Sequence, residues 1–178
     1  MTEMRKLKKM SNIILVDGPD GTGKTGYAQW LSEETGFKFL RLEPDHAFGR
    51  LDGETIEHMS SVFNYTLTQL VEQDVDLVID RGPVSSIVYS RLFDRDSPTH
   101  AWDALLELDP HIIYLRCEPE ELSIRYEDEK FTDVASIARM YDTVMEELRD
   151  ADFDVVTVET SCGAPDNIRS MVNHWLYE

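Results

Sequence analysis

Cysteine is scarce in this sequence, which contains only Cys117 and Cys162 among its 178 residues. Two thiols do not form the disulfide framework of a small secreted protein, and their spacing matches no metal-ligand motif. No apolar run approaches the roughly 18 residues of a membrane-spanning helix, and no apolar signal segment follows the basic start of the chain. We therefore expect a soluble protein in a reducing cytoplasm, either its own or that of a host cell.

Positive charge is also in short supply, because 17 basic residues stand against 35 acidic ones and give a formal net charge of −18. Such a surface repels the phosphate backbone of nucleic acids, so DNA is disfavoured as a partner unless the site is locally basic. The acidic composition resembles that of salt-adapted proteins. The sequence does not define the oligomeric state, and a homodimer is one alternative. We expect residues 1–11, which include the basic Arg5, Lys6, Lys8 and Lys9, to form a mobile, solvated arm.

A glycine-rich loop follows the first apolar run, the residues IILV at 13–16. Its residues fit the pattern G-x-x-x-x-G-K-[ST], in which backbone N–H groups at a helix N-terminus surround phosphates and the hydroxyl ligates Mg²⁺. The alternative is a glycine-rich turn with an exposed lysine. We predict that ATP is held by Gly18, Asp20, Gly21, Thr22, Gly23, Lys24 and Thr25.

Apolar runs and helical patterns alternate along the whole chain, without linkers, repeats or low-complexity segments. We predict strands at 13–16, 37–42, 75–80, 111–117 and 153–159. Helices are predicted after Lys24, over 56–70, from about Pro83, over 134–148 and in the tail to Leu176. This order predicts one α/β domain over 1–178, a three-layer P-loop NTPase fold with a five-stranded parallel sheet.

The third predicted strand ends in Asp80 and Arg81. A carboxylate at the tip of an apolar strand is the Walker-B arrangement, in which it helps to hold Mg²⁺ opposite the hydroxyl of Thr25. The alternative role for Asp80 is to cap the next helix. Arg81 can bind a phosphate or a sugar-side oxygen, or it can simply pair with Asp80 or Asp45.

Three segments resemble the nucleoside and nucleotide kinase group. GPDGTGKT at 18–25 resembles the P-loop of thymidylate kinases, and DRGPVSSIVY at 80–89 is similar to their D-R-x-x-x-S-S-x-x-Y segment. RLEPD at 41–45 resembles the Glu-Pro turn of thymidylate and deoxynucleoside kinases. The resemblance implies that Asp20 faces the acceptor's sugar, that Arg81 is the acceptor-side arginine, and that Glu43 deprotonates a 5′-hydroxyl.

The sequence departs from thymidylate kinases at two positions that bear on the acceptor. Leu42 separates Arg41 from Glu43, and Gly82 replaces the aromatic residue after Asp-Arg. For Glu43 the alternative is an ordinary strand-end glutamate before proline. The lid is expected at about 125–133, where the many arginines usual in such kinases are missing. Arg125 is its candidate for neutralising charge, and a solvated helix residue is the alternative.

These features predict a phosphotransferase that uses ATP and Mg²⁺ and acts on a nucleotide or nucleoside-type acceptor, as thymidylate-kinase-like monophosphate kinases do. Its catalytic residues would be Lys24, Asp80, Arg81, Glu43 and Arg125, with Thr25 and Asp80 at the metal. One alternative is a deoxynucleoside kinase, and another is a viral-type kinase that phosphorylates 5-hydroxymethyluracil in DNA. A non-catalytic nucleotide-binding regulator would need a damaged site, whereas Lys24, Thr25 and Asp80 are all present.

Overall fold

The computed structural model describes residues 13–41, 53–71, 73, 75–94, 99–125 and 133–161. The strands are β1 (Ile13–Asp17), β2 (Lys38–Arg41), β3 (Leu77–Asp80), β4 (His111–Arg116) and β5 (Val155–Glu159). The helices are α1 (Lys24–Thr35), α3 (Gly53–Val71), α4 (Pro83–Leu92), α5 (Thr99–Leu108), α6 (Pro119–Arg125) and α7 (Val134–Asp150).

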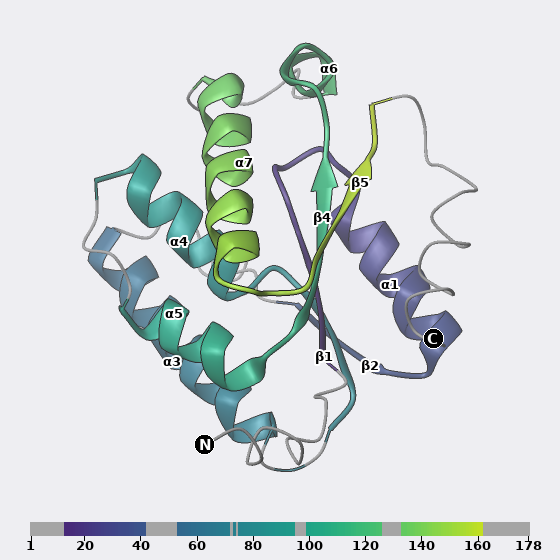
Figure 1. The fold of residues 1–178 in the computed structure, drawn as a ribbon, viewed down its shortest axis with the longest axis vertical. Helices are drawn as coiled ribbons and strands as arrows, with labels where there is room; N and C mark the ends of the chain where they lie inside the picture. The colour runs from purple at the N-terminus through teal and green to yellow at the C-terminus, as the bar shows by residue number, and fades with distance from the viewer. Residues whose placement is uncertain are drawn as a thin grey trace.

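The five strands form one parallel sheet in the order β2-β3-β1-β4-β5 (Figure 1). The predicted fold class is therefore confirmed. β1 lies in the middle, and the strand order reverses around it, which is where open α/β sheets bind ligands, beyond the carboxyl ends of their strands. That edge is at the top of Figure 1, where β4 points and α6 lies.

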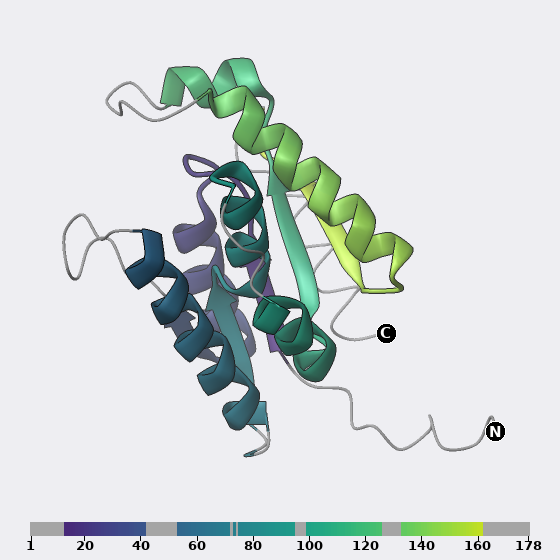
Figure 2. The ribbon, with the colours of Figure 1, turned by 90° about the vertical axis from the view of Figure 1, so that its left-hand side faces the viewer.

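Helices cover both faces of the sheet (Figures 1 and 2). Alternate residues of β1 point to opposite faces. Ile13 and Leu15 join a cluster with residues of α3, α4, α5 and α7, whereas Ile14 and Val16 pack against α1. A strand buried on both faces has to be continuously apolar, which explains the sequence IILV.

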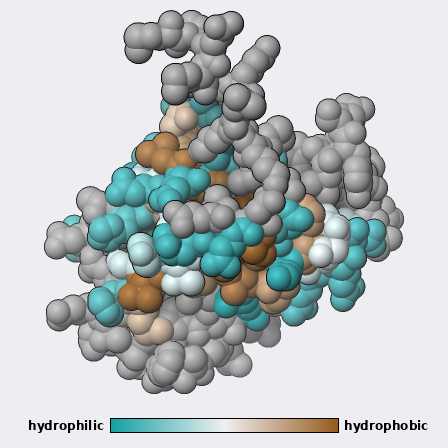
Figure 3. All heavy atoms as spheres, turned by 90° about the horizontal axis from the view of Figure 1, so that it is seen from below, coloured by the Kyte–Doolittle hydropathy of each residue, from teal (hydrophilic) through white to brown (hydrophobic). Residues whose placement is uncertain are grey.

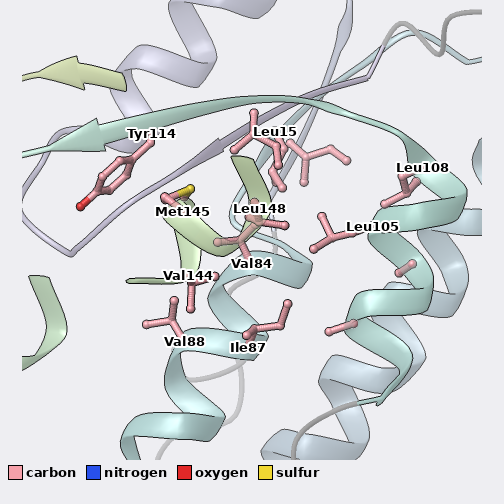
Figure 4. Packing of buried hydrophobic residues seen from close by; sticks show 14 of the residues in the cluster. Leu15, Val84, Ile87, Val88, Leu105, Leu108, Tyr114, Val144, Met145 and Leu148 are labelled. Atoms are coloured by element: carbon pink, nitrogen blue, oxygen red, sulfur yellow. The ribbon is translucent and has the colours of Figure 1, made fainter. Parts of the chain in front are cut away.

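The larger core lies between the sheet, α4 and α7 (Figure 4). The sequence spacing of Val134, Ile137, Tyr141, Val144 and Leu148 predicts one apolar face on α7. Tyr141, Val144 and Leu148 are buried in this core, and Ile137 and Val134 are partly buried. Tyr114 of β4 lies beside Met145, and its hydroxyl points away from the cluster. That hydroxyl donates a hydrogen bond to Asp142 at 2.9 Å.

Two helices differ from the sequence prediction. We predicted one helix between the third and fourth strands, but α4 ends at Leu92 and α5 begins at Thr99. Asp94 has a left-handed backbone with φ of 49°, which a continuing α-helix cannot contain. The second difference is α6, a helix that the sequence prediction did not include and that ends at Arg125, the first residue of the expected lid. The basic arm, Glu43, residues 126–132 of the lid and the predicted final helix lie outside the described residues.

The surface of the described residues is mixed in character. Figure 3 views the end of the molecule where the strands begin, and hydrophilic residues there separate several hydrophobic spots. Among the described helices, none has both the length and the apolar character needed to cross a membrane.

Candidate active site

The glycine-rich loop lies between β1 and α1, as the motif requires, and its backbone makes unusual turns. Gly18, Gly21 and Gly23 have φ values of 150°, 80° and 85°, which residues with a side chain rarely adopt. A Cβ atom on Gly18 would lie 2.3 Å from the backbone oxygen of Leu115 in β4. Glycine is therefore needed at position 18 for backbone conformation and for close approach to β4.

Lys24 begins α1, and its side chain is folded back over the loop. Only 5% of the side chain is exposed, and its Nζ donates hydrogen bonds to the Pro19 carbonyl at 2.7 Å and to Asp20 Oδ1 at 3.1 Å. Burial lowers the pKa of Lys24 to about 8, although the charges of Asp17 and Asp80 oppose the shift. The amine is thus held over the loop for which the sequence predicts a phosphate site, and a polyphosphate bound there would offset its charge.

The pKa of Lys24 predicts a pH dependence of nucleotide binding. Only the protonated amine attracts phosphate, so the affinity for ADP should fall as the pH rises through about 8. Calorimetric titration with ADP in buffers on either side of that pH measures the change. Lys24→Arg should flatten the dependence, because a guanidinium keeps its charge throughout this range. A profile with the same slope in both proteins would assign the dependence to another group.

Asp80 lies at the end of β3, opposite the first turn of α1. The Thr25 hydroxyl donates to Asp80 Oδ2 at 2.7 Å, and the Nε of Arg41 lies 3.1 Å from the same oxygen. The parallel register places Arg41 directly beside Asp80. The alternative role as a helix cap is wrong, because Gly82 is the N-cap residue of α4 and the Asp80 carboxylate contacts Thr25 and Arg41 instead of the first turn of that helix.

The second carboxylate oxygen of Asp80 supports a cation site. Oδ1 is buried and has no hydrogen-bond partner among the described residues. An unpaired buried carboxylate oxygen is costly, and a cation next to Thr25 would satisfy it. In the described part of the chain, no three His, Cys, Asp or Glu side chains gather into a metal site. Mg²⁺ fits this limited donor set, because it commonly keeps waters and phosphate oxygens as its other ligands.

Arg81 turns toward the loop rather than toward Asp80. Its φ is 67°, an uncommon value for a bulky residue, and its guanidinium forms an ion pair with Asp20. Asp20 Oδ2 also accepts a hydrogen bond from the hydroxyl of Tyr89 at 3.3 Å. The pairing with Asp80 that we considered for Arg81 is wrong, and Asp45 lies outside the described residues. Lys24 and Arg81 thus meet at one carboxylate.

Arg125 ends α6 and reaches the glycine-rich loop. It donates to the Gly21 carbonyl at 3.1 Å and to the Thr160 carbonyl at 2.8 Å, and it pairs with Glu121. The alternative of a merely solvated arginine is therefore wrong, since its guanidinium bonds two backbone carbonyls from other parts of the chain. Arg125 holds the start of the expected lid against the loop.

The sequence alone did not single out Asp17, Tyr141 or the contact between Arg41 and Asp80. Asp17 could have been found, because it is a carboxylate at the end of an apolar strand, the same signal that identified Asp80. Tyr141 gave no polar signal, since its spacing is that of a core residue. Arg41 lies opposite Asp80 only because β2 pairs with β3.

No protein-family model matches the sequence, and no curated protein resembles it significantly. Solved structures do resemble the fold. Deoxyadenosine kinase from M. mycoides with bound dCTP has a TM-score of 0.64 at 16% identity, covering 93% of this chain and 100% of that one. Thymidylate kinase from Candida albicans has a TM-score of 0.60 at 15% identity, and the match covers 92% of this chain and 90% of that one.

Shikimate kinase from Acinetobacter baumannii, in complex with shikimate, also matches, with a TM-score of 0.64 at 19% identity and coverage of 97% and 96%. At such low identities the similarity concerns the fold. The chain thus has the fold of P-loop kinases, including nucleoside and nucleotide kinases, as the sequence resemblance implied.

Proposed function

We propose that this protein is an ATP- and Mg²⁺-dependent phosphotransferase for a nucleotide or nucleoside-type acceptor, most closely of the thymidylate kinase type. The observation that carries the proposal is the grouping of charges at the loop. Lys24 and Arg81 converge on Asp20, while Thr25 and the unpaired oxygen of Asp80 lie alongside. Phosphoryl transfer asks a protein mainly for positioning and charge, which such a group supplies.

Each residue has a separate role in this proposal. The loop amides and Lys24 bind the donor phosphates, and Thr25 and Asp80 hold Mg²⁺, which would neutralise charge on the transferred group. Arg81 and Arg125 offset the remaining negative charge. Asp20 and Glu43 orient the acceptor, with Glu43 as the base where the acceptor is a hydroxyl.

An acceptor screen tests the function directly. ATP consumption is measured with dTMP, other nucleoside monophosphates, thymidine, shikimate and DNA that contains 5-hydroxymethyluracil. We expect a nucleoside monophosphate to stimulate turnover, with dTMP the first to try. Stimulation by thymidine alone would identify a nucleoside kinase, and stimulation by shikimate would reject the nucleotide class. If ADP binds but no acceptor raises turnover, the proposal loses its catalytic part.

Salt dependence separates a free nucleotide from DNA as the acceptor. Neutralising six to ten DNA phosphates costs about a thousandfold or more in affinity between roughly 50 and 200 mM salt. A mononucleotide makes few phosphate contacts, so we expect a shallow dependence of its apparent affinity. A steep loss with hydroxymethylated DNA, together with no turnover on dTMP, would favour the DNA-base kinase instead.

Asp80→Asn should raise the Mg²⁺ concentration needed for half-maximal activity, because it removes charge but keeps the shape of the side chain. An activity titration with Mg²⁺ and a thermal melt measure the two effects separately. Asp103→Asn, an equivalent change at an exposed position of α5, is the control and should match the wild type. An unchanged titration for Asp80→Asn would leave this residue a purely structural role beside Thr25 and Arg41.

A further inference from the structure

Asp17 is the last residue of β1, directly before the glycine-rich loop, and its side chain is fully buried. Its Oδ1 accepts hydrogen bonds from the Gly18 backbone at 2.8 Å, from the Ser85 hydroxyl at 2.7 Å and from the Tyr141 hydroxyl at 2.9 Å. Its Oδ2 accepts one from the Ser85 backbone at 3.0 Å. One carboxylate thus joins the start of the loop to α4 and α7.

The contact with Ser85 replaces a missing helix cap. The first N–H groups of a helix have no partner within the helix, and the N-cap residue Gly82 has no side chain to offer them. Asp17 satisfies one of them, at Ser85, from a different element of the fold. The positive end of the α4 dipole favours the negative charge at this point. The position of α4 is therefore tied to the residue that begins the loop.

A second contact ties the same helix to the middle of the loop. Tyr89 lies one turn after Ser85 on the same face of α4, and its hydroxyl donates to Asp20. The Tyr141 ring meets the Tyr89 ring edge-on, with centroids 6.4 Å apart, and so supports its orientation. The loop is thus fastened to α4 at both Asp17 and Asp20, with Tyr141 of α7 between the two attachments.

We propose that Asp17 is a positioning residue of the phosphate-binding loop and acts through Ser85 and Tyr141. This inference rests on the proposed function. Burial raises the pKa of Asp17 above its usual value, so the buried carboxylate is a costly means of joining elements for stability alone. Its hydrogen bonds instead fix the distance and direction between the loop, α4 and α7, because such bonds weaken steeply when misaligned.

The test compares variants of this network in ADP affinity by calorimetry, in kcat and in melting temperature. Asp17→Asn keeps the size of the side chain but places an amide donor among donors, and we expect kcat and ADP affinity to fall by about tenfold to a hundredfold, the scale of a 1 Å misplacement. Tyr141→Phe and Ser85→Ala should each cause a smaller loss in the same direction. The double variant Asp17→Asn with Tyr141→Phe should lose less ADP affinity and kcat than the product of the two single fold-losses, because both changes break the same hydrogen-bond network.

Tyr114→Phe is the matched control. It also removes one hydroxyl from a buried tyrosine, whose ring stacks on Tyr141 with centroids 6.1 Å apart, but that hydroxyl binds Asp142 instead of Asp17. It should lower the melting temperature while ADP affinity and kcat stay at the wild-type values. If Asp17→Asn does not fold, Tyr141→Phe and Ser85→Ala against this control decide the question.

Equal effects of Tyr141→Phe and Tyr114→Phe on ADP affinity would overturn the inference and leave Asp17 as a structural residue. A change in melting temperature alone, in all network variants, would do the same. These outcomes leave the proposed function standing, since the wild type still binds ADP. Failure of the wild type itself to bind ADP would instead reject both the proposed function and the positioning role.

Discussion

Replacing Lys24 with alanine is expected to lower turnover by about a hundredfold or more, the scale on which removal of one transition-state electrostatic partner acts. The chain should remain folded. Lys24 donates to the Pro19 carbonyl, but that oxygen also accepts a hydrogen bond from the Thr22 hydroxyl at 2.8 Å and so keeps a partner in the variant. The loss therefore falls on phosphate binding, which acceptor-stimulated ATP consumption and ADP titration both measure.

Lys38→Ala is the control for this experiment, because Lys38 is an exposed lysine of β2. It removes the same charge from a protein with a net charge of −18, so it separates the local role of Lys24 from a general effect of charge. The control should match the wild type in turnover. Near-normal turnover of Lys24→Ala would mean that the loop does not bind the phosphates of the reaction.

Gly18→Ala is expected to destabilise the protein severely and to abolish nucleotide binding. The added Cβ would overlap the carbonyl oxygen of Leu115, which belongs to a central strand and cannot move aside alone. Overpacking and backbone strain each cost about 1–3 kcal/mol, a large part of the stability of a typical domain. Chemical denaturation and ADP titration measure the two losses.

Gly26→Ala provides the opposite expectation within the same segment. Gly26 lies in α1, and a Cβ atom there would meet no atom of the described residues within 4 Å. Alanine is favoured over glycine in a helix interior by about 0.8–1 kcal/mol, and part of this gain applies to Gly26 in the first turn of α1. This variant should therefore melt at or slightly above the wild-type temperature. If Gly18→Ala had the same denaturation midpoint as the wild type, the inferred close contact between Gly18 and β4 would be contradicted.

The sequence by itself determined the elements that depend on local pattern. The run IILV predicts a strand buried on both faces, and the spacing of Tyr141, Val144 and Leu148 predicts the buried stripe of α7. These predictions succeed because apolar periodicity and glycine-rich turns record burial and backbone conformation directly. The order of strands and helices then limits the topology to a parallel sheet, which brings Lys24, Thr25 and Asp80 to one edge.

Only the tertiary structure decided which charged groups meet at that edge. Arg41 faces Asp80 because β2 pairs with β3 in one particular register, and Arg81 reaches Asp20 because its backbone is left-handed. The buried contacts of Asp17 join residues 68 and 124 positions away in the chain. No local pattern specifies such pairs, because a side-chain hydrogen bond depends on distances of a few tenths of an ångström between elements whose packing is set by the whole core.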